Sequence, residues 1–203
     1  MKFNTDNPFF RFMGTLVSFT ALNLSFLLTC LPIFTIGTAL ASLFNTTLSY
    51  IENEDLPLTK TYFKNFKLNF KSTTIIFLIT AAVIAIISFN IAFWQKFNSI
   101  VSQPIFVVLI VILALIAFVV ELLFPLAGRF QNSIKQTFKN AVLMVLPNFF
   151  KVLLLLAIDA AAFGLGYVSE FARVMYIIFG LAFIAYVKSF LLKNIFKKYG
   201  SNE

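Results

Sequence analysis

The longest apolar run of the chain carries no charged residue from position 12 to position 51. A single helix over this run would be about 60 Å long, twice the roughly 30 Å hydrocarbon core of a bilayer. Pro32 disfavours helix in the residue before it, and Gly37 tolerates the backbone angles of a turn. We therefore expect a hairpin, with a first membrane segment over 12–31 and a second over 36–51.

The second segment of this hairpin is short and polar for a membrane helix. As a helix it would be about 24 Å long. Its hydroxyl and amide side chains are Thr38, Ser42, Asn45, Thr46, Thr47 and Ser49. Lipid offers such groups no hydrogen-bond partner, so we expect the segment to pack inside a helical bundle. The pattern leaves open whether the segment crosses the bilayer or is re-entrant.

A polar turn at 52–57 is followed by a segment, 59–71, in which lysine and phenylalanine recur at helical spacing. The lysines, on one stripe of a helix, are Lys60, Lys64, Lys67 and Lys71, and the phenylalanines of the adjacent stripe are Phe63, Phe66 and Phe70. This pattern is typical of an interfacial amphipathic helix, with phenylalanine in the acyl boundary and lysine on anionic lipid headgroups. A solvated loop with flanking lysines is the alternative.

Four later segments are long and apolar enough to cross a membrane. They are 73–95, 104–127, 147–168 and 176–192. Most of the connections between them are short, which favours antiparallel neighbours. The sequence thus predicts an all-α fold, a polytopic transmembrane helical bundle of six membrane segments in a single domain over 1–203.

Composition supports a membrane protein and argues against an enzyme. Hydrophobic residues make up 60% of the chain and charged residues 12%, whereas soluble domains carry about 25% charged residues. The chain has no histidine, which removes the usual general base near neutral pH and the commonest metal ligand. Cys30 is the sole cysteine, so neither an intrachain disulfide nor a thiolate metal cluster can form. We expect no catalysis, no cofactor and no metal.

The net charge of +8 indicates membrane topology rather than nucleic-acid binding, because the basic residues flank apolar runs instead of forming one patch. With six segments, both termini share a side with 59–71 and with the loop 128–146, where most lysines and arginines lie. Lys96 and Arg173 lie on the opposite side. The positive-inside rule then places both termini in the cytoplasm. Leaving 36–51 outside the bilayer weakens this bias.

Ionisable residues inside a membrane are costly, and each is a candidate functional site. Glu121 lies about 9 Å, and Lys151 about 6 Å, from the cytoplasmic ends of their predicted helices. We expect an ion pair that fastens these two helices, with a cation or proton relay as the alternative.

Asp159 lies about 18 Å into its predicted helix, near the midplane, and no basic residue of another segment is expected at that depth. It should face the bundle interior and either accept hydrogen bonds or stay protonated, because burial disfavours the charged form. Asn23 and Asn90 are candidate polar neighbours. Asp159 is then either a hydrogen-bonded helix clamp or part of a solute or proton site.

The stretch 23–50, followed by 62–74, resembles the opening of the YesL family, small bacterial membrane proteins grouped as a domain of unknown function. The matching positions are Asn23-Leu24, Pro32, Thr35, Gly37 and Ala39, followed by Phe63, Phe66 and Phe70. A later match is FPLAGRF at 124–130, leading into 139–148.

Members of this family often lie beside genes for carbohydrate uptake through ABC importers. The resemblance implies a non-catalytic accessory protein of the bacterial plasma membrane, with an ABC-importer permease as candidate partner and a homo-oligomer as a further option. The rival hypothesis is a small solute carrier or channel that uses Asp159 and Glu121. A polar face of 36–51 that opens into a water-filled cavity shared with Asp159 would favour the carrier, and a dry bundle would favour the accessory role.

Overall fold

The computed structural model describes residues 8–97 and 100–199, and every regular element within them is helical, as the sequence predicts. The α-helices are α1 (Pro8–Cys30), α2 (Ile36–Glu52), α3 (Leu58–Trp94), α4 (Ser102–Arg129), α5 (Ile134–Val145), α6 (Phe149–Val168), α7 (Glu170–Met175) and α8 (Leu181–Phe196). Short 3-10 turns cover Ile33–Thr35 and Leu146–Asn148, and a π-helical turn covers Tyr176–Gly180.

Several of these helices have the length and apolar character of membrane spans. Among the described residues there are five such stretches: Phe12–Cys30, Leu58–Trp94, Ser102–Arg129, Ile134–Val168 and Glu170–Phe196. The chain is therefore a multi-pass membrane protein by length and composition of its helices. Helix α2 has 17 residues and is not one of the five.

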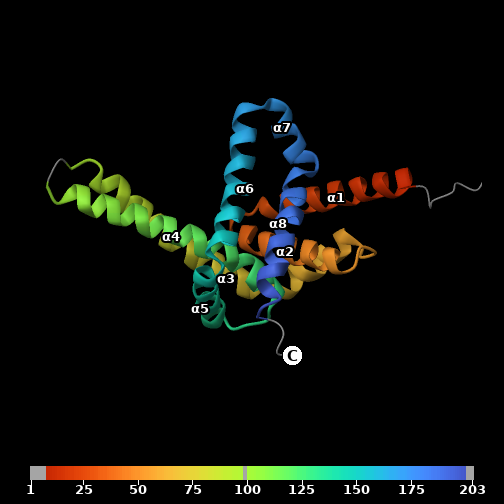
Figure 1. The fold of residues 1–203 in the computed structure, drawn as a ribbon, viewed down its shortest axis with the longest axis horizontal. Helices are drawn as coiled ribbons and strands as arrows, with labels where there is room; N and C mark the ends of the chain where they lie inside the picture. The colour runs from red at the N-terminus through yellow and green to blue at the C-terminus, as the bar shows by residue number, and fades with distance from the viewer. Residues whose placement is uncertain (1–7, 98–99, 200–203) are drawn as a thin grey trace, which may run out of the picture.

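Helix α2 lies at the centre of the molecule, in contact with α1, α3, α4 and α8 (Figure 1). Ten of its 17 residues are buried: Gly37, Thr38, Ala39, Ala41, Ser42, Leu43, Phe44, Thr46, Thr47 and Leu48. We call α2 and the segments packed around it, 58–80 of α3, 122–128 of α4 and 185–196 of α8, the hub. The expectation that 36–51 packs inside the bundle is confirmed.

Polar side chains join the helices of the hub. Thr73 Oγ1 donates to Thr38 Oγ1 over 2.8 Å, linking α3 to α2. Asn65 Nδ2 of α3 donates to Thr46 Oγ1 of α2 over 3.2 Å. Thr47 Oγ1 and Ser189 Oγ of α8 lie 2.7 Å apart. Because an apolar medium supplies no competing partners, interhelical hydrogen bonds of this kind fasten the helices, at about 0.6 kcal/mol each on average in a membrane protein.

The predicted break between α1 and α2 is confirmed. Helix α1 ends at Cys30, one residue before the Leu31–Pro32 step, and the Thr35 hydroxyl donates to the carbonyl oxygens of Thr29 and Pro32 over 2.5 and 2.6 Å. The turn role expected for Gly37 is wrong, because Gly37 lies inside α2. A Cβ there would come within 2.4 Å of Phe77 Cβ, so glycine permits close contact between α2 and α3.

The separate interfacial helix expected at 59–71 is not present as its own element. This segment is helical, but it continues without a break into the membrane stretch, giving the 37 residues of α3, about 55 Å in length. No proline or glycine interrupts Leu58–Trp94, so nothing in the backbone ends the helix at Lys71. The lysines of the predicted stripe, Lys60, Lys64, Lys67 and Lys71, are all exposed.

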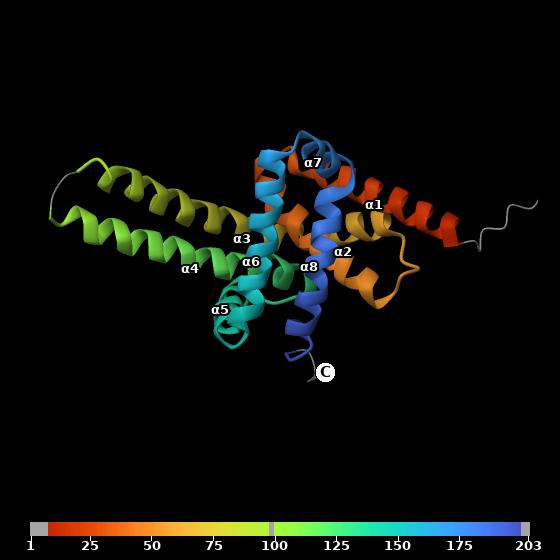
Figure 2. The same ribbon diagram turned by 45° about the horizontal axis from the view of Figure 1, so that its top comes forward.

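Besides the N-terminal part of α1, two helical pairs extend away from the hub in different directions (Figures 1 and 2). One is the α3–α4 arm, formed by residues 81–97 and 100–117. The other is the α6–α8 arm, in which α6 runs antiparallel to the start of α8 and the short α7 connects them. In the most apolar stretches of α3 and α4, 11% and 6% of the residues are buried.

Candidate functional site

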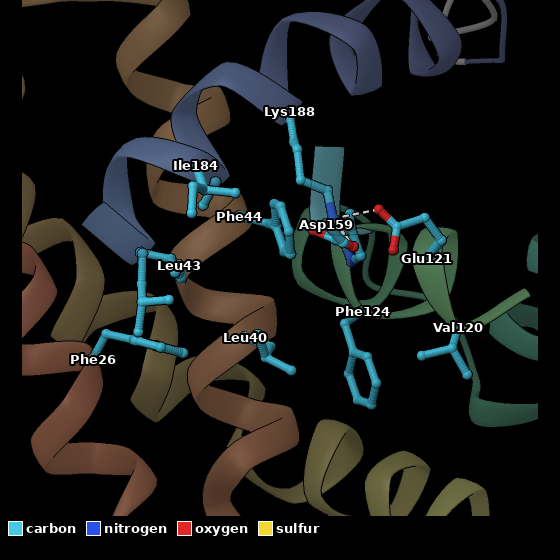
Figure 3. Close-up of a pocket in the computed structure, with 13 residues that line it drawn as sticks. Phe26, Leu40, Leu43, Phe44, Val120, Glu121, Phe124, Asp159, Ile184 and Lys188 are labelled. Atoms are coloured by element: carbon cyan, nitrogen blue, oxygen red, sulfur yellow. Dashed lines mark hydrogen bonds and ion pairs between the residues drawn. The ribbon is translucent and has the colours of Figure 1, made fainter. Parts of the chain in front are cut away.

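Three ionisable side chains from three helices meet where the α6–α8 arm joins the hub (Figure 3). They are Glu121 of α4, Asp159 of α6 and Lys188 of α8. Lys188 Nζ donates to both oxygens of Asp159, over 2.8 Å to Oδ1 and 2.7 Å to Oδ2. The same ammonium forms an ion pair with Glu121 Oε1. We call these three residues the charge triad.

The members of the charge triad differ in exposure. The side chains of Lys188 and Glu121 are 5% and 10% exposed, whereas that of Asp159 is 43% exposed. Removing charges from water costs several kcal/mol per ion, which close pairing offsets. Lys188 therefore needs both carboxylates nearby, and the two carboxylates need Lys188.

Two features of neighbouring helices adjoin the charge triad. On α4, Pro125 follows Glu121 by four residues and has no N–H to donate to the Glu121 carbonyl, so that carbonyl lacks its usual intrahelical donor. On α2, Phe44 presents its ring to the triad, with the ring centroid 5.5 Å from Lys188 Nζ. An ammonium near a ring face at this distance is attracted by the ring's negative charge density. Lys188 thus lies among two carboxylates and one aromatic ring.

The charge triad lines an apolar cavity of about 240 Å³ between α2, α4, α6 and α8. Its other walls come from Phe26, Leu40, Leu43, Phe44, Val120, Phe124, Pro125, Leu181, Ile184 and Ala185. Figure 3 shows Leu40, Leu43 and Phe44 of α2 on one side and the triad on the other. We call this space the inner cavity.

A second cavity of about 590 Å³ lies along the α6–α8 arm and shares Asp159, Leu181 and Ile184 with the inner cavity. Its remaining walls are Ala162, Phe163, Gly166, Tyr167, Arg173 and Tyr176. We call it the outer cavity. Asp159 is the charged side chain that both cavities share.

The expected ion pair between Glu121 and Lys151 is wrong, because Glu121 pairs with Lys188. The expectation that no basic residue of another segment shares the depth of Asp159 is also wrong, because Lys188 of α8 pairs with Asp159. Depth along a helix does not fix which way a side chain points around the helix axis. Moreover, α8 runs to Phe196 and not to 192, so Lys188 lies about 12 Å inside its end.

Lys188 is the member of the charge triad that the expectations from the sequence missed. A signal was available in the sequence. Lys188 follows FIAYV and is followed closely by FLL, whereas Lys193, Lys197 and Lys198 cluster at the end of the helix. A lysine with apolar residues on both sides is a candidate for an intramembrane ion pair.

Neither asparagine expected near Asp159 bonds to it in the described part of the chain. Asn90 Nδ2 donates to the Ile86 carbonyl of its own helix over 2.8 Å. Asn23 bonds to the π-helical turn before α8: its Nδ2 donates to the carbonyls of Tyr176 and Ile177, and its Oδ1 accepts from the backbone N–H of Ala182. A π-helical turn leaves some backbone groups without their regular α-helical hydrogen bonds. Asn23 bonds to groups of this region and thereby holds the turn against α1.

Comparison with known proteins identifies one matching family model. Residues 19–91 match the family described as "Protein of unknown function, DUF624". This part of the chain runs from within α1 to near the end of α3 and contains α2, whereas the charge triad lies outside it. No curated protein and no solved structure matches the chain significantly.

Proposed function

We propose that the chain is a non-catalytic accessory protein of a bacterial plasma membrane that binds a partner membrane protein. The permease of a carbohydrate ABC importer is the candidate partner, on the strength of the resemblance to the YesL family. The observation that carries the proposal is the use of the polar stripe of α2. Thr38, Thr46 and Thr47 are fully buried and bonded to α3 and α8, so the stripe fastens helices instead of lining a water path.

The α3–α4 arm supplies a surface for such a partner. Large apolar side chains on it are exposed, including Val83, Ile86, Phe89, Val107, Val111 and Leu115. A surface of this kind suits lipid tails or the apolar helices of another membrane protein. Small residues at Ala81 and Ala85 would let a partner helix, or a second copy of the chain, approach closely.

We further propose that both termini are cytoplasmic and that the lysine stripe of α3 contacts anionic headgroups. All four lysines of that stripe are exposed, which supports this contact. The absence of histidine from the sequence supports a role without acid–base catalysis.

Affinity purification in a mild detergent, followed by mass spectrometry, tests the accessory role. Tagged full-length protein should co-purify with an importer permease when expressed in its own host. Ala85→Trp, on the exposed side of α3, should reduce the recovered partner, while Gly14→Trp on α1, where nothing lies within 4 Å, should not. A pure monomer that carries no permease would reject the proposal.

A second candidate function, a small solute carrier or channel, is favoured by one observation. Glu121 and Asp159 both line the inner cavity, and Asp159 also lines the outer one. Reconstitution into vesicles that contain a pH-sensitive dye tests this function. Proton flux in the unmodified protein that Asp159→Asn abolishes would support it, and equal flux in vesicles without protein would reject it.

A further inference from the structure

Asp159 is the member of the charge triad that lines the outer cavity. Both its oxygens accept from Lys188 Nζ, yet 43% of its side chain stays exposed. Glu121, which shares the same ammonium, is almost closed off at 10% exposure. A ligand that reaches the charge triad through the outer cavity would therefore meet Asp159 first.

The charge triad has an excess of negative charge when both carboxylates are ionised. Two carboxylates and one ammonium sum to −1. The excess charge is costly because Glu121 and Lys188 are buried, so a cation beside Asp159 would lower the free energy of the site. Arg173, at another wall of the outer cavity, lies 3.4 Å from Glu170 Oε1, which offsets its positive charge.

The walls of the outer cavity match a particular kind of cation. Three aromatic residues, Phe163, Tyr167 and Tyr176, line it together with apolar Ala162, Leu181 and Ile184. Phe163 and Tyr167 are 80% and 81% exposed, so the space is open on their side. Aromatic faces beside a carboxylate are the usual surroundings of quaternary ammonium groups in proteins. The primary ammonium of Lys188 already lies near both carboxylates and the ring of Phe44, so this part of the molecule accommodates a cation beside an aromatic ring. The volume of about 590 Å³ is within the range of small-molecule pockets.

We propose that the outer cavity binds a small organic cation with a quaternary ammonium group, which lies against Asp159 while its apolar part contacts the aromatic wall. The site is the one invoked for the carrier function, but the proposal concerns binding alone. Binding without flux would reject the carrier and keep the site, and failure of the permease purification would not affect it.

Equilibrium dialysis of the detergent-purified full chain against radiolabelled choline tests the proposal. The protein should bind choline saturably, and Asp159→Asn should weaken binding at least about tenfold, because it removes the counter-charge. Lys197→Gln, at an exposed position just after the end of α8, is the matched control and should leave binding unchanged. A neutral competitor of the same shape, 3,3-dimethylbutan-1-ol, should displace choline poorly.

A second variant keeps the test decisive if Asp159→Asn folds badly. Tyr167→Leu removes one aromatic ring from the outer cavity at an exposed position, so it should weaken choline binding several-fold without changing thermal unfolding, an effect that a purely structural role would not produce. Equal affinity in the unmodified protein and Asp159→Asn, or equal displacement by the neutral competitor, would overturn the proposal, as would the absence of saturable binding. Repeating the dialysis with the protein in phosphatidylcholine nanodiscs shows whether a lipid headgroup or a free cation is the ligand, since a headgroup would block choline.

Discussion

The hub buries many polar side chains, and the α3–α4 arm exposes large apolar ones. A soluble protein usually does the opposite in both respects. In the hub, threonine, serine and asparagine side chains are buried against one another, as Thr38, Thr46 and Asn65 illustrate. In the arm, large apolar residues such as Phe89 and Ile86 are exposed, at 72% and 62%. Where the solvent is lipid, exposing apolar surface costs nothing and burying polar groups together gains hydrogen bonds. The comparison teaches that helix contacts in this chain use polar and small residues alongside apolar packing.

Substitution of Lys188 should give the largest loss of stability. Lys188→Met leaves Glu121 and Asp159 without a counter-charge, and we expect a loss of about 4 kcal/mol, as for other broken buried ion pairs. Thermal unfolding in detergent, followed by circular dichroism, measures it. Lys197→Met, an exposed position near the end of α8, should change the midpoint little. Equal midpoints for the two variants would show that the charge triad does not hold α4, α6 and α8 together.

Glycine-to-alanine substitutions compare the hub with the arms by the room that each leaves for one added methyl group. A Cβ on Gly128 would lie 2.2 Å from the carbonyl oxygen of Ala41, where α4 meets α2, and backbone atoms cannot turn aside. Gly128→Ala should therefore cost about 3 kcal/mol by overpacking. Gly164→Ala, on the α6–α8 arm with nothing within 4 Å, is the control and should be neutral or slightly stabilising. A detergent unfolding series that ranks the two variants the other way would contradict the close contact between α4 and α2 at Gly128.

Asn23 and Asn90 test whether a polar side chain stabilises the fold more when it bonds to another helix than when it bonds within its own helix. Asn23→Leu removes three hydrogen bonds to the backbone of Tyr176, Ile177 and Ala182 and should cost about 2 kcal/mol. Asn90→Leu removes one bond within its own helix, on the α3–α4 arm, and should have almost no effect. Amide hydrogen exchange followed by mass spectrometry should show faster exchange over 176–182 in the first variant alone. Unchanged exchange there would mean that Asn23 does not hold the π-helical turn.

The smallest effect is expected from a single hydroxyl of the hub. Thr73→Val keeps the shape of the side chain but removes its bond to Thr38, so we expect a loss of about 0.6 kcal/mol. Thr20→Val, whose hydroxyl bonds within α1 to the Leu16 carbonyl, is the control. A difference of this size needs a chemical unfolding curve and not a single melting point. A stabilised Thr73→Val variant would indicate that the bond between Thr73 and Thr38 does not help to join α2 and α3.

The sequence was sufficient for the class of fold, because length and hydropathy determine whether a helix suits a bilayer. The hairpin break at Pro32 and the burial of the polar segment 36–51 were also predictable, since both follow from local chemistry. Two local predictions were wrong: Gly37 lies in a helix and not in a turn, and 59–71 is part of α3. In each case the sequence carried a pattern compatible with two structures, and packing against neighbouring helices selected one.

The charge triad could be predicted in part. Glu121 and Asp159 were recognised because a charge inside an apolar run is costly wherever it lies. Their partner was not recognised, because pairing depends on the rotation of three helices about their axes and on where α8 ends. The sequence by itself determined that this chain belongs in a membrane and which of its residues are too polar for lipid. Tertiary structure alone decided which of those residues meet, because helices distant in the sequence are brought together by contacts that no local pattern records.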